Sequence, residues 1–296
     1  MPAVARARFV AGILLVLMAL SSGEAGLYAD DETSLLPPPT LRVVPYSRDL
    51  LPAPVTSMAT GPRGFLWLGT RAGLFRYDGY EIVRWTRLQP PPNRPAGAPI
   101  VTALAAGATG EGPSLWMAAE GAGLYRYEPA ERQFQLVVDE QRLGSPVSAL
   151  TWDARGSLVV GTRSSGILFV DPNGGVHDRL RNDPTTARTL SSDHIASIAL
   201  APGGELFIAT ADRGLNVLTA DRGSIAVERR QIGREAGLPT DRLRAVAVDA
   251  HGGLWVGGAD GSLAVRPAGE RVFVGLLERE TGAAITSLLP DANGGL

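Results

Sequence analysis

The feature of this 296-residue sequence that most restricts its fold is a unit that recurs six times along it. In the first copy, from Val55 to Thr86, apolar residues at alternate positions predict four short strands separated by tight turns. Later copies begin at Val101, Val147, Ile195, Leu243 and Ile285. A small residue holds the same place in five copies, 43 to 49 positions apart, at Gly69, Ala118, Gly161, Ala209 and Gly257. A single four-stranded sheet cannot bury both of its faces, so the copies must stack as the blades of a β-propeller.

The predicted fold is therefore all-β, with four-stranded antiparallel blades, five of them complete and a sixth begun, in an incomplete ring. The sixth copy reads ITSLLPDANGGL and reaches Leu296, so we expect a fragment of a propeller with further blades. Residues Leu41–Tyr46 form a separate apolar segment before the first blade. We expect this segment to pair as the outermost strand of the last blade and so to close the ring.

Four repeated positions have a predictable structural role. The pattern D-x-x-G at 153–156, 249–252 and 291–294 predicts a tight turn between the first two strands, because Asp accepts backbone hydrogen bonds and Gly supplies a positive φ. Glycine ends this turn at Gly64, Gly156, Gly204, Gly252 and Gly294. A large apolar residue of the second strand is expected to wedge between blades, at Trp67, Trp116, Val159, Phe207 and Trp255. The small residue two positions further on lets adjacent sheets approach closely.

One longer phrase carries a family resemblance. Residues 64–78 read G-x-L-W-x-G-T-x-x-G-L-x-R-Y-D, which resembles the two-component-regulator propeller repeat. That repeat is found in the extracytoplasmic sensor halves of hybrid histidine kinases and of some membrane-bound diguanylate cyclases. The third and fourth copies lack the tryptophan, and the fifth has Gly258 in place of threonine. The resemblance covers about Leu41 to the end and implies a sensor whose ligand changes the conformation or the dimer geometry of a receptor.

The first residues are expected to export the chain rather than to join its fold. Residues 1–25 hold two arginines, a twelve-residue apolar stretch from Phe9 to Leu20 and then small residues, the pattern of a secretory signal peptide. An uncleaved membrane anchor is the alternative. Residues 26–40 are acidic and then proline-rich, as in a spacer, and residues 41–296 form the partial propeller. Both alternatives predict a periplasmic or other extracytoplasmic location.

Composition excludes several classes of function. The net charge of −2 and the pI of about 6.0 give no long-range attraction to nucleic acid or to an anionic membrane. Contact with a membrane would come only through the N-terminal segment or a span downstream of this chain. All 28 basic residues are arginine and there is no cysteine, which excludes a Schiff-base lysine, a P-loop lysine and a thiol nucleophile. We expect no cofactor.

The predicted binding residues lie between the second and third strands of each blade. These turns share one rim of a propeller with the segments that join one blade to the next, and propellers usually recognise partners there. The residues are Arg71, Glu120, Arg163, Ser164, Asp212, Arg213 and Asp260. Charges of both signs suit a polar small molecule, an oligosaccharide or a protein, although each residue is also what a solvated turn would carry.

Catalysis by this chain is not expected. His251 lies inside a D-x-x-G turn, and His177 and His194 flank one polar loop without the spacing of metal ligands, so we predict no metal site. No nucleophile, base and orienting partner can be assembled from local sequence. Residues of separate blades could still converge across the channel.

Three functions remain open. The first is the ligand-sensing part of a bacterial transmembrane receptor, a homodimer in its full-length form, with a kinase or cyclase output outside this chain. The second is a free-standing secreted propeller that binds a protein or a glycan. The third, less favoured, is a secreted propeller enzyme acting on a polysaccharide or a lactone.

Overall fold

The predicted all-β propeller is confirmed. A computed structural model of the chain describes residues 51–90, 99–109, 112–186, 189–219, 225–226, 237–277 and 283–290. These ranges contain twenty strands, which form five antiparallel sheets of four strands each. The described helical structure is limited to α1 (Glu140–Leu143) and the 3-10 turn η2 (Pro62–Gly64). The predicted signal peptide, the spacer and the predicted closing strand Leu41–Tyr46 all lie outside the described residues.

Each blade is a meander in which every strand pairs with the next one along the chain. Blade 1 contains β1 (Val55–Thr60), β2 (Leu66–Thr70), β3 (Gly73–Tyr77) and β4 (Ile82–Trp85). Blade 2 contains β5 (Ile100–Thr109), β6 (Gly112–Glu120), β7 (Gly123–Glu128) and β8 (Gln133–Asp139). Blade 3 contains β9 (Val147–Trp152), β10 (Leu158–Thr162), β11 (Ile167–Val170) and β12 (Val176–Leu180).

The last two sheets follow the same plan. Blade 4 contains β13 (Ile195–Leu200), β14 (Leu206–Thr210), β15 (Leu215–Leu218) and β16 (Ile225–Ala226). Blade 5 contains β17 (Leu243–Val248), β18 (Leu254–Gly258), β19 (Leu263–Arg266) and β20 (Val274–Leu277).

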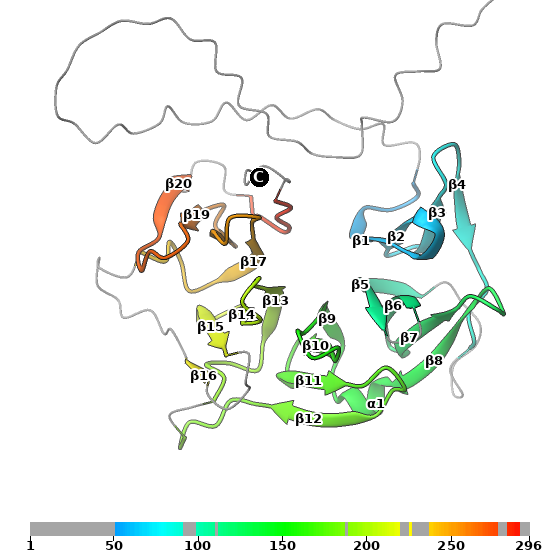
Figure 1. Ribbon diagram of the computed structural model, residues 1–296, viewed down its shortest axis with the longest axis horizontal. Helices are drawn as coiled ribbons and strands as arrows, with labels where there is room; N and C mark the ends of the chain where they lie inside the picture. The colour runs from blue at the N-terminus through cyan, green and yellow to red at the C-terminus, as the bar shows by residue number, and fades with distance from the viewer. Residues whose placement is uncertain are drawn as a thin grey trace, which may run out of the picture.

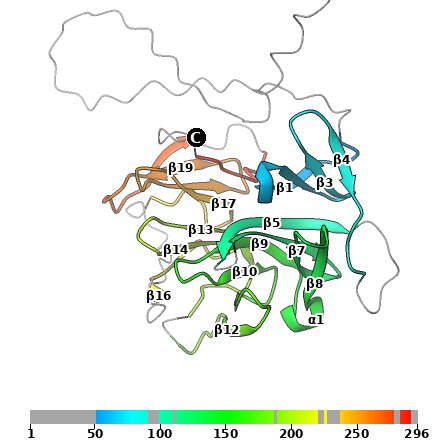
Figure 2. The same cartoon turned by 45° about the vertical axis from the view of Figure 1, so that its right-hand side comes forward.

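The blades are arranged around a common axis with their first strands innermost. Figure 1 shows β1, β5, β9, β13 and β17 nearest the centre and β4, β8, β12, β16 and β20 at the periphery. Each first strand contacts the first strand of the next blade, from β1 to β5 and so on to β17. Figures 1 and 2 show that blades 1 and 5 lie at the two ends of this arc and that residues 283–290 lie at the end of blade 5 that faces blade 1.

Close packing between blades depends on the small residue of the second strand. A Cβ added to Gly69 would come within 2.6 Å of Val101, and one added to Gly161 within 2.7 Å of Ile195. In both cases the neighbour is at the start of the next blade's first strand. A Cβ added to Gly257 would likewise come within 2.5 Å of Ile285, and the backbone N–H of Ile285 donates to Gly258 O at 3.0 Å. Residues 283–290 therefore occupy the place of the first strand of a sixth blade.

The large residue of the second strand fills the space between blades. Trp67 is 1% exposed and packs among Val101, Leu104 and Met117 of blade 2, and Trp116 packs in the same way against blade 3. Phe207 of blade 4 packs against Val246 and Leu254 of blade 5. Trp255, the equivalent residue of blade 5, is half-buried.

The turns have the expected chemistry. Asp153 Oδ1 accepts from the backbone N–H groups of Arg155 and Ser157, and Asp249 Oδ1 accepts from those of His251 and Gly253. The turn-ending glycines have positive φ values of 75° to 88°, at Gly64, Gly156, Gly204 and Gly252. Because these turns are fixed by their own hydrogen bonds, the side chains that flank them have defined positions on the surface.

Candidate functional site

The turns divide between two rims of the propeller. The connection rim is defined here by the turns between second and third strands together with the segments that join the blades. The hairpin rim is defined by the turns between first and second strands and between third and fourth strands. Since every strand is antiparallel to its neighbour, these two sets of turns must lie at opposite ends of the sheets.

The structure places the seven predicted binding residues on the connection rim, in separate local contacts. Arg163 Nη2 lies 3.2 Å from Glu120 Oε2 and links blade 3 to blade 2. Ser164 Oγ donates to Ser145 Oγ at 3.0 Å. Asp212 Oδ2 lies 3.2 Å from His194 Nδ1 within blade 4.

The remaining predicted residues are also dispersed. Asp260 Oδ1 accepts from the hydroxyl and the backbone N–H of Ser262, which fixes its own turn. Arg71 and Arg213 are exposed. Among the ion pairs recorded between described residues, the one that joins two members of this set of seven is the pair of Glu120 and Arg163. The connection rim as a ligand site remains a prediction.

In three blades, a buried threonine at the end of the second strand donates a hydrogen bond to the turn of the connection rim. The hydroxyl of Thr70 donates to Gly73 O at 2.8 Å, and Thr162 and Thr210 make the same bond to Gly166 and Gly214. In the fifth copy Gly258 replaces this threonine. A Cβ there would come within 2.5 Å of Asp260 Oδ1 and 2.4 Å of Ser262 Oγ, so these two side chains occupy the space instead.

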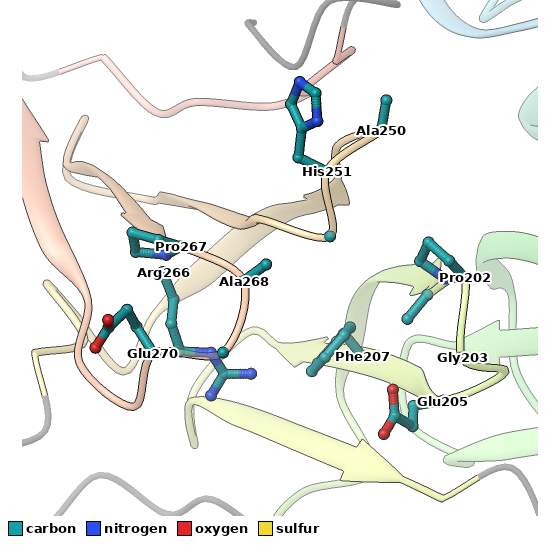
Figure 3. A pocket seen from close by; sticks show the side chains of 13 residues that line it. Pro202, Gly203, Glu205, Phe207, Ala250, His251, Arg266, Pro267, Ala268 and Glu270 are labelled. Carbon is teal, nitrogen blue, oxygen red and sulfur yellow. The ribbon is translucent and has the colours of Figure 1, made fainter.

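The hairpin rim contains a hollow that the sequence analysis missed. A pocket of about 410 Å³ opens between blades 4 and 5. Its walls are the turn 201–205, the turn 250–252, Phe207 and residues 266–270. Figure 3 shows these residues surrounding the pocket, with Pro202 and Glu205 on the blade 4 side and Arg266 and Pro267 on the blade 5 side.

The most distinctive feature of this pocket is a guanidinium that lies within cation–π distance of two aromatic rings. Arg266 Cζ lies 5.5 Å from the ring centre of Phe207 in blade 4 and 5.3 Å from that of Phe273 in blade 5. Both rings are buried, at 8% and 6% exposure, whereas Arg266 is half-buried. Cation–π attraction to both rings therefore holds the charge at the junction of two blades.

Two carboxylates and one imidazole belong to the same pocket. Glu205 and Glu270 are exposed, and so is His251 at the tip of its turn. Together with Arg266 they give the pocket charges of both signs beside apolar walls of proline, alanine and Phe207. Chemically, such a pocket suits recognition of a small polar ligand that also has an apolar part.

The repeat contains a signal that could have revealed this site. In four blades, the third-strand residue that pairs with the first leucine of the second strand lies on the same face of the sheet as that leucine. These third-strand residues are Tyr77 in blade 1, Val170 in blade 3, Leu218 in blade 4 and Arg266 in blade 5. Three copies have a large aromatic or apolar residue there and the fifth has arginine. That face of blade 5 packs against Phe207 of blade 4, so an arginine at this position must meet the wedge residue of the preceding blade.

The described residues give no further indication of chemistry. His177 is on β12, His194 on the connection rim and His251 on the hairpin rim, so the three histidines lie on different parts of the molecule. No group of three potential metal ligands occurs among the residues searched, which are those with a described placement. Within the same ranges, no helix has both the length and the hydropathy that a membrane span requires.

Comparison with known proteins identifies structural rather than sequence relatives. No family model and no curated protein matches the sequence. The structure is similar to the extracellular domain assigned to the hybrid two-component system BT3049 of B. thetaiotaomicron, with a TM-score of 0.58 and 22% identity over 74% of this chain and 29% of that one. It is also similar to the extracellular domain assigned to the one-component system BT4673 of the same organism, with a TM-score of 0.57 and 18% identity over 81% of this chain and 37% of that one.

An enzyme shares the fold as well. Virginiamycin B lyase from Staphylococcus aureus is similar with a TM-score of 0.58 and 11% identity, over 81% of this chain and 75% of that one. At these identities the likeness shows the fold and not the activity. The chain spans about a third of the length of the extracellular domains that it matches. Those domains fit the resemblance to the two-component-regulator propeller repeat.

Proposed function

We propose that this chain is the extracytoplasmic, ligand-sensing propeller portion of a bacterial transmembrane signalling receptor. The receptor is a two-component histidine kinase or a diguanylate cyclase whose output domain lies outside the chain. One observation carries the proposal: the repeat phrase at 64–78 stands in a propeller fold shared with extracellular domains of two-component systems. The signal-peptide pattern of residues 1–25 supports the location.

The proposed mechanism depends on a difference in binding between two states. A ligand transmits a signal only if it binds one conformation or one dimer geometry better than the other. The pocket between blades 4 and 5 is suited to this, because a ligand there contacts turns of two separate sheets. Occupancy would therefore favour one relative position of the blades, and a homodimeric receptor would pass this change to its membrane spans.

Two alternative functions make different predictions. A free-standing secreted propeller would bind a protein or a glycan without any output domain. An enzyme acting on a polysaccharide or a lactone would use acids or histidines of one site, and among the described residues Glu205, Glu270 and His251 share the pocket between blades 4 and 5. We propose that this chain recognises its ligand and does not transform it, because the repeat phrase at 64–78 and the shared propeller fold favour a sensor.

Two measurements test the proposal. The first is the reading frame after the codon for Leu296: the receptor requires further blades, then a membrane span and a kinase or cyclase domain. A stop codon soon after blade closure would support the free-standing binder instead. The second is a fusion of residues 1–296 to alkaline phosphatase, which is active only outside the cytoplasm. Activity of the fusion, lost when residues 1–25 are removed, is expected, and equal activity without them would contradict export by this segment.

A further inference from the structure

We propose that the connection rim of blade 3 binds a tetrahedral oxyanion, a sulfate or a phosphate group, through Ser165, Arg179 and Arg181. This site is separate from the pocket between blades 4 and 5. Its binding can be measured on this chain alone, whereas a role of the anion in signalling rests on the proposed function.

The first observation is a buried hydroxyl that the fold does not use. Ser165 lies in the turn between β10 and β11 and is 3% exposed. Its backbone N–H donates to Thr162 Oγ1 at 2.9 Å, whereas no hydrogen bond of its own Oγ is recorded among the described residues. Blade 2 has Ala122 at the same place of the turn, also buried, so the turn does not require a hydroxyl. A buried hydroxyl without a partner costs free energy, and a ligand that accepts from it would remove that cost.

An exposed glycine gives access to this hydroxyl. Gly144 ends α1 with a φ of 81°. The point that a Cβ would occupy on Gly144 lies 3.1 Å from Ser165 Oγ and 3.6 Å from Arg179 Nη1. The hydroxyl and the guanidinium therefore face the same exposed glycine, and they are close enough to contact one small ligand.

Arg179 and Arg181 supply two positive charges that backbone carbonyls hold in place. Arg179 Nη2 donates to Arg142 O at 2.9 Å, and Arg181 Nε lies 3.4 Å from Ser165 O. Each guanidinium has five N–H donors, and the bonds recorded between described residues use one donor of each. Both groups thus lie beside Ser165 and keep donors for a ligand.

Among the described residues, no carboxylate pairs with these two charges. The recorded ion pairs include neither Arg179 nor Arg181. Asp178 and Asp193, the acids of the adjoining segments, each direct one oxygen to a backbone N–H group, of Arg179 and of Asn182, at 2.7 Å. Two positive charges without a recorded carboxylate partner favour a ligand with two negative charges.

The set of donors favours a tetrahedral oxyanion over a carboxylate. A carboxylate has one charge and two oxygens, whereas sulfate and the dianion of phosphate have two charges and at least three oxygens that accept hydrogen bonds. Two guanidinium groups and one hydroxyl match the second pattern. Inorganic ions and the terminal groups of larger molecules share this chemistry, so the test has to separate them.

The test titrates the purified 296-residue chain with sulfate, phosphate, phenyl phosphate and acetate, with sodium chloride added to keep the ionic strength constant. Chemical shifts of the backbone amides of Gly144 and Ser165 report the binding. We expect saturable shifts with sulfate and phosphate at a dissociation constant of about 1 mM, and about tenfold weaker binding of acetate. Equal binding of phenyl phosphate and phosphate supports a phosphorylated ligand, and binding of the inorganic ions alone supports a site for the free anion.

Three variants locate the contacts. Ser165→Ala introduces the residue that blade 2 has at this place, so it should fold normally and weaken sulfate by about tenfold. Arg179→Gln and Arg181→Gln should each weaken sulfate by about tenfold as well. Arg71→Gln and Arg213→Gln are matched controls, because these exposed arginines lie on the same rim in blades 1 and 4 and their loss removes the same charge. Thermal unfolding of each variant checks that it is folded.

Four results would overturn the assignment. They are sulfate shifts no larger than those of sodium chloride, equal binding of sulfate and acetate, undiminished binding by folded Ser165→Ala, and equal losses in the controls and the site variants. None of them would bear on the reading frame or the export test. A failure here would therefore remove the anion site and leave the proposed receptor function to its own tests.

Discussion

Trp255 donates its indole N–H to Asp249 Oδ2 at 2.8 Å, and the other carboxylate oxygen of Asp249 accepts two backbone N–H groups of the adjoining turn. One buried side chain thus ties the second strand of blade 5 to the turn that precedes it. The first copy lacks this link: Gly61 stands in the place of Asp249, and a Cβ there would come within 2.5 Å of Trp67 Nε1. Among the described residues, Trp67 Nε1 is buried without an acceptor.

This relationship predicts a graded effect of substitution at Asp249. Asp249→Ala removes the acceptor of three N–H groups and should destabilise the chain by about 2–4 kcal/mol. Asp249→Asn keeps the oxygen that the turn requires but presents an amide N–H to the indole, so it should cost about 1–2 kcal/mol. Urea unfolding followed by tryptophan fluorescence measures both changes. A neutral Asp249→Asn would show that the indole contact contributes nothing, and equal losses for the two variants would show that the two turn contacts contribute nothing.

The close approach between blades predicts the outcome of adding one methyl group. Gly69→Ala places a Cβ within 2.6 Å of Val101 and should destabilise by about 1–3 kcal/mol, because the two sheets must move apart. Gly275→Ala is the matched control: this glycine is also in a strand, and nothing lies within 4 Å of its added Cβ. Thermal unfolding of the two variants checks the difference. A neutral Gly69→Ala would mean that the blades can separate without loss of packing.

The wedge tryptophans should differ in importance according to their burial. Trp67→Ala removes a ring that is 1% exposed and surrounded by blade 2, so we expect a loss of about 3–5 kcal/mol. Trp255 is half-buried, and Trp255→Ala should cost clearly less in this chain. Denaturant titration of both variants gives the comparison. A loss below about 1 kcal/mol for Trp67→Ala would remove that residue from the core.

The strands and turns of this fold can be predicted from local sequence, because residues close together in the chain specify each of them. Alternation of apolar residues defines β2, and the pair Asp153 and Gly156 defines the turn before β10 through its own hydrogen bonds and backbone angles. The wedge at Trp67 and the small residue at Gly69 follow from the need of one blade to pack on the next. The wedge and the small residue recur in five copies and the D-x-x-G turn in three, so several independent examples support each of them.

The candidate site could not be predicted in the same way, because it depends on how two copies differ. The charge of Arg266 is held at the blade junction because Phe207 of the preceding blade and Phe273 of its own blade both lie within cation–π distance of it. Phe273 is in an irregular segment outside the repeat pattern, and the turns of both blades supply the walls. The charged residues of the turns predicted a site on the connection rim, where the structure places those residues in separate local contacts.

A last prediction concerns pH and the turn between β3 and β4. The backbone N–H groups of Glu81 and Tyr80 donate to Asp78 Oδ1 at 3.0 and 2.9 Å, and these bonds hold the pKa of Asp78 below its ordinary value of 3.8. Since the folded pKa is the lower one, the stabilisation is fully present above the unfolded pKa and is lost as the pH falls through the folded value. NMR titration of the Asp78 carboxyl should therefore give a midpoint below 3.8. Asp78→Asn should keep most of the turn and abolish this part of the acid dependence, whereas a midpoint at or above 3.8 would show that the two N–H bonds do not form in solution.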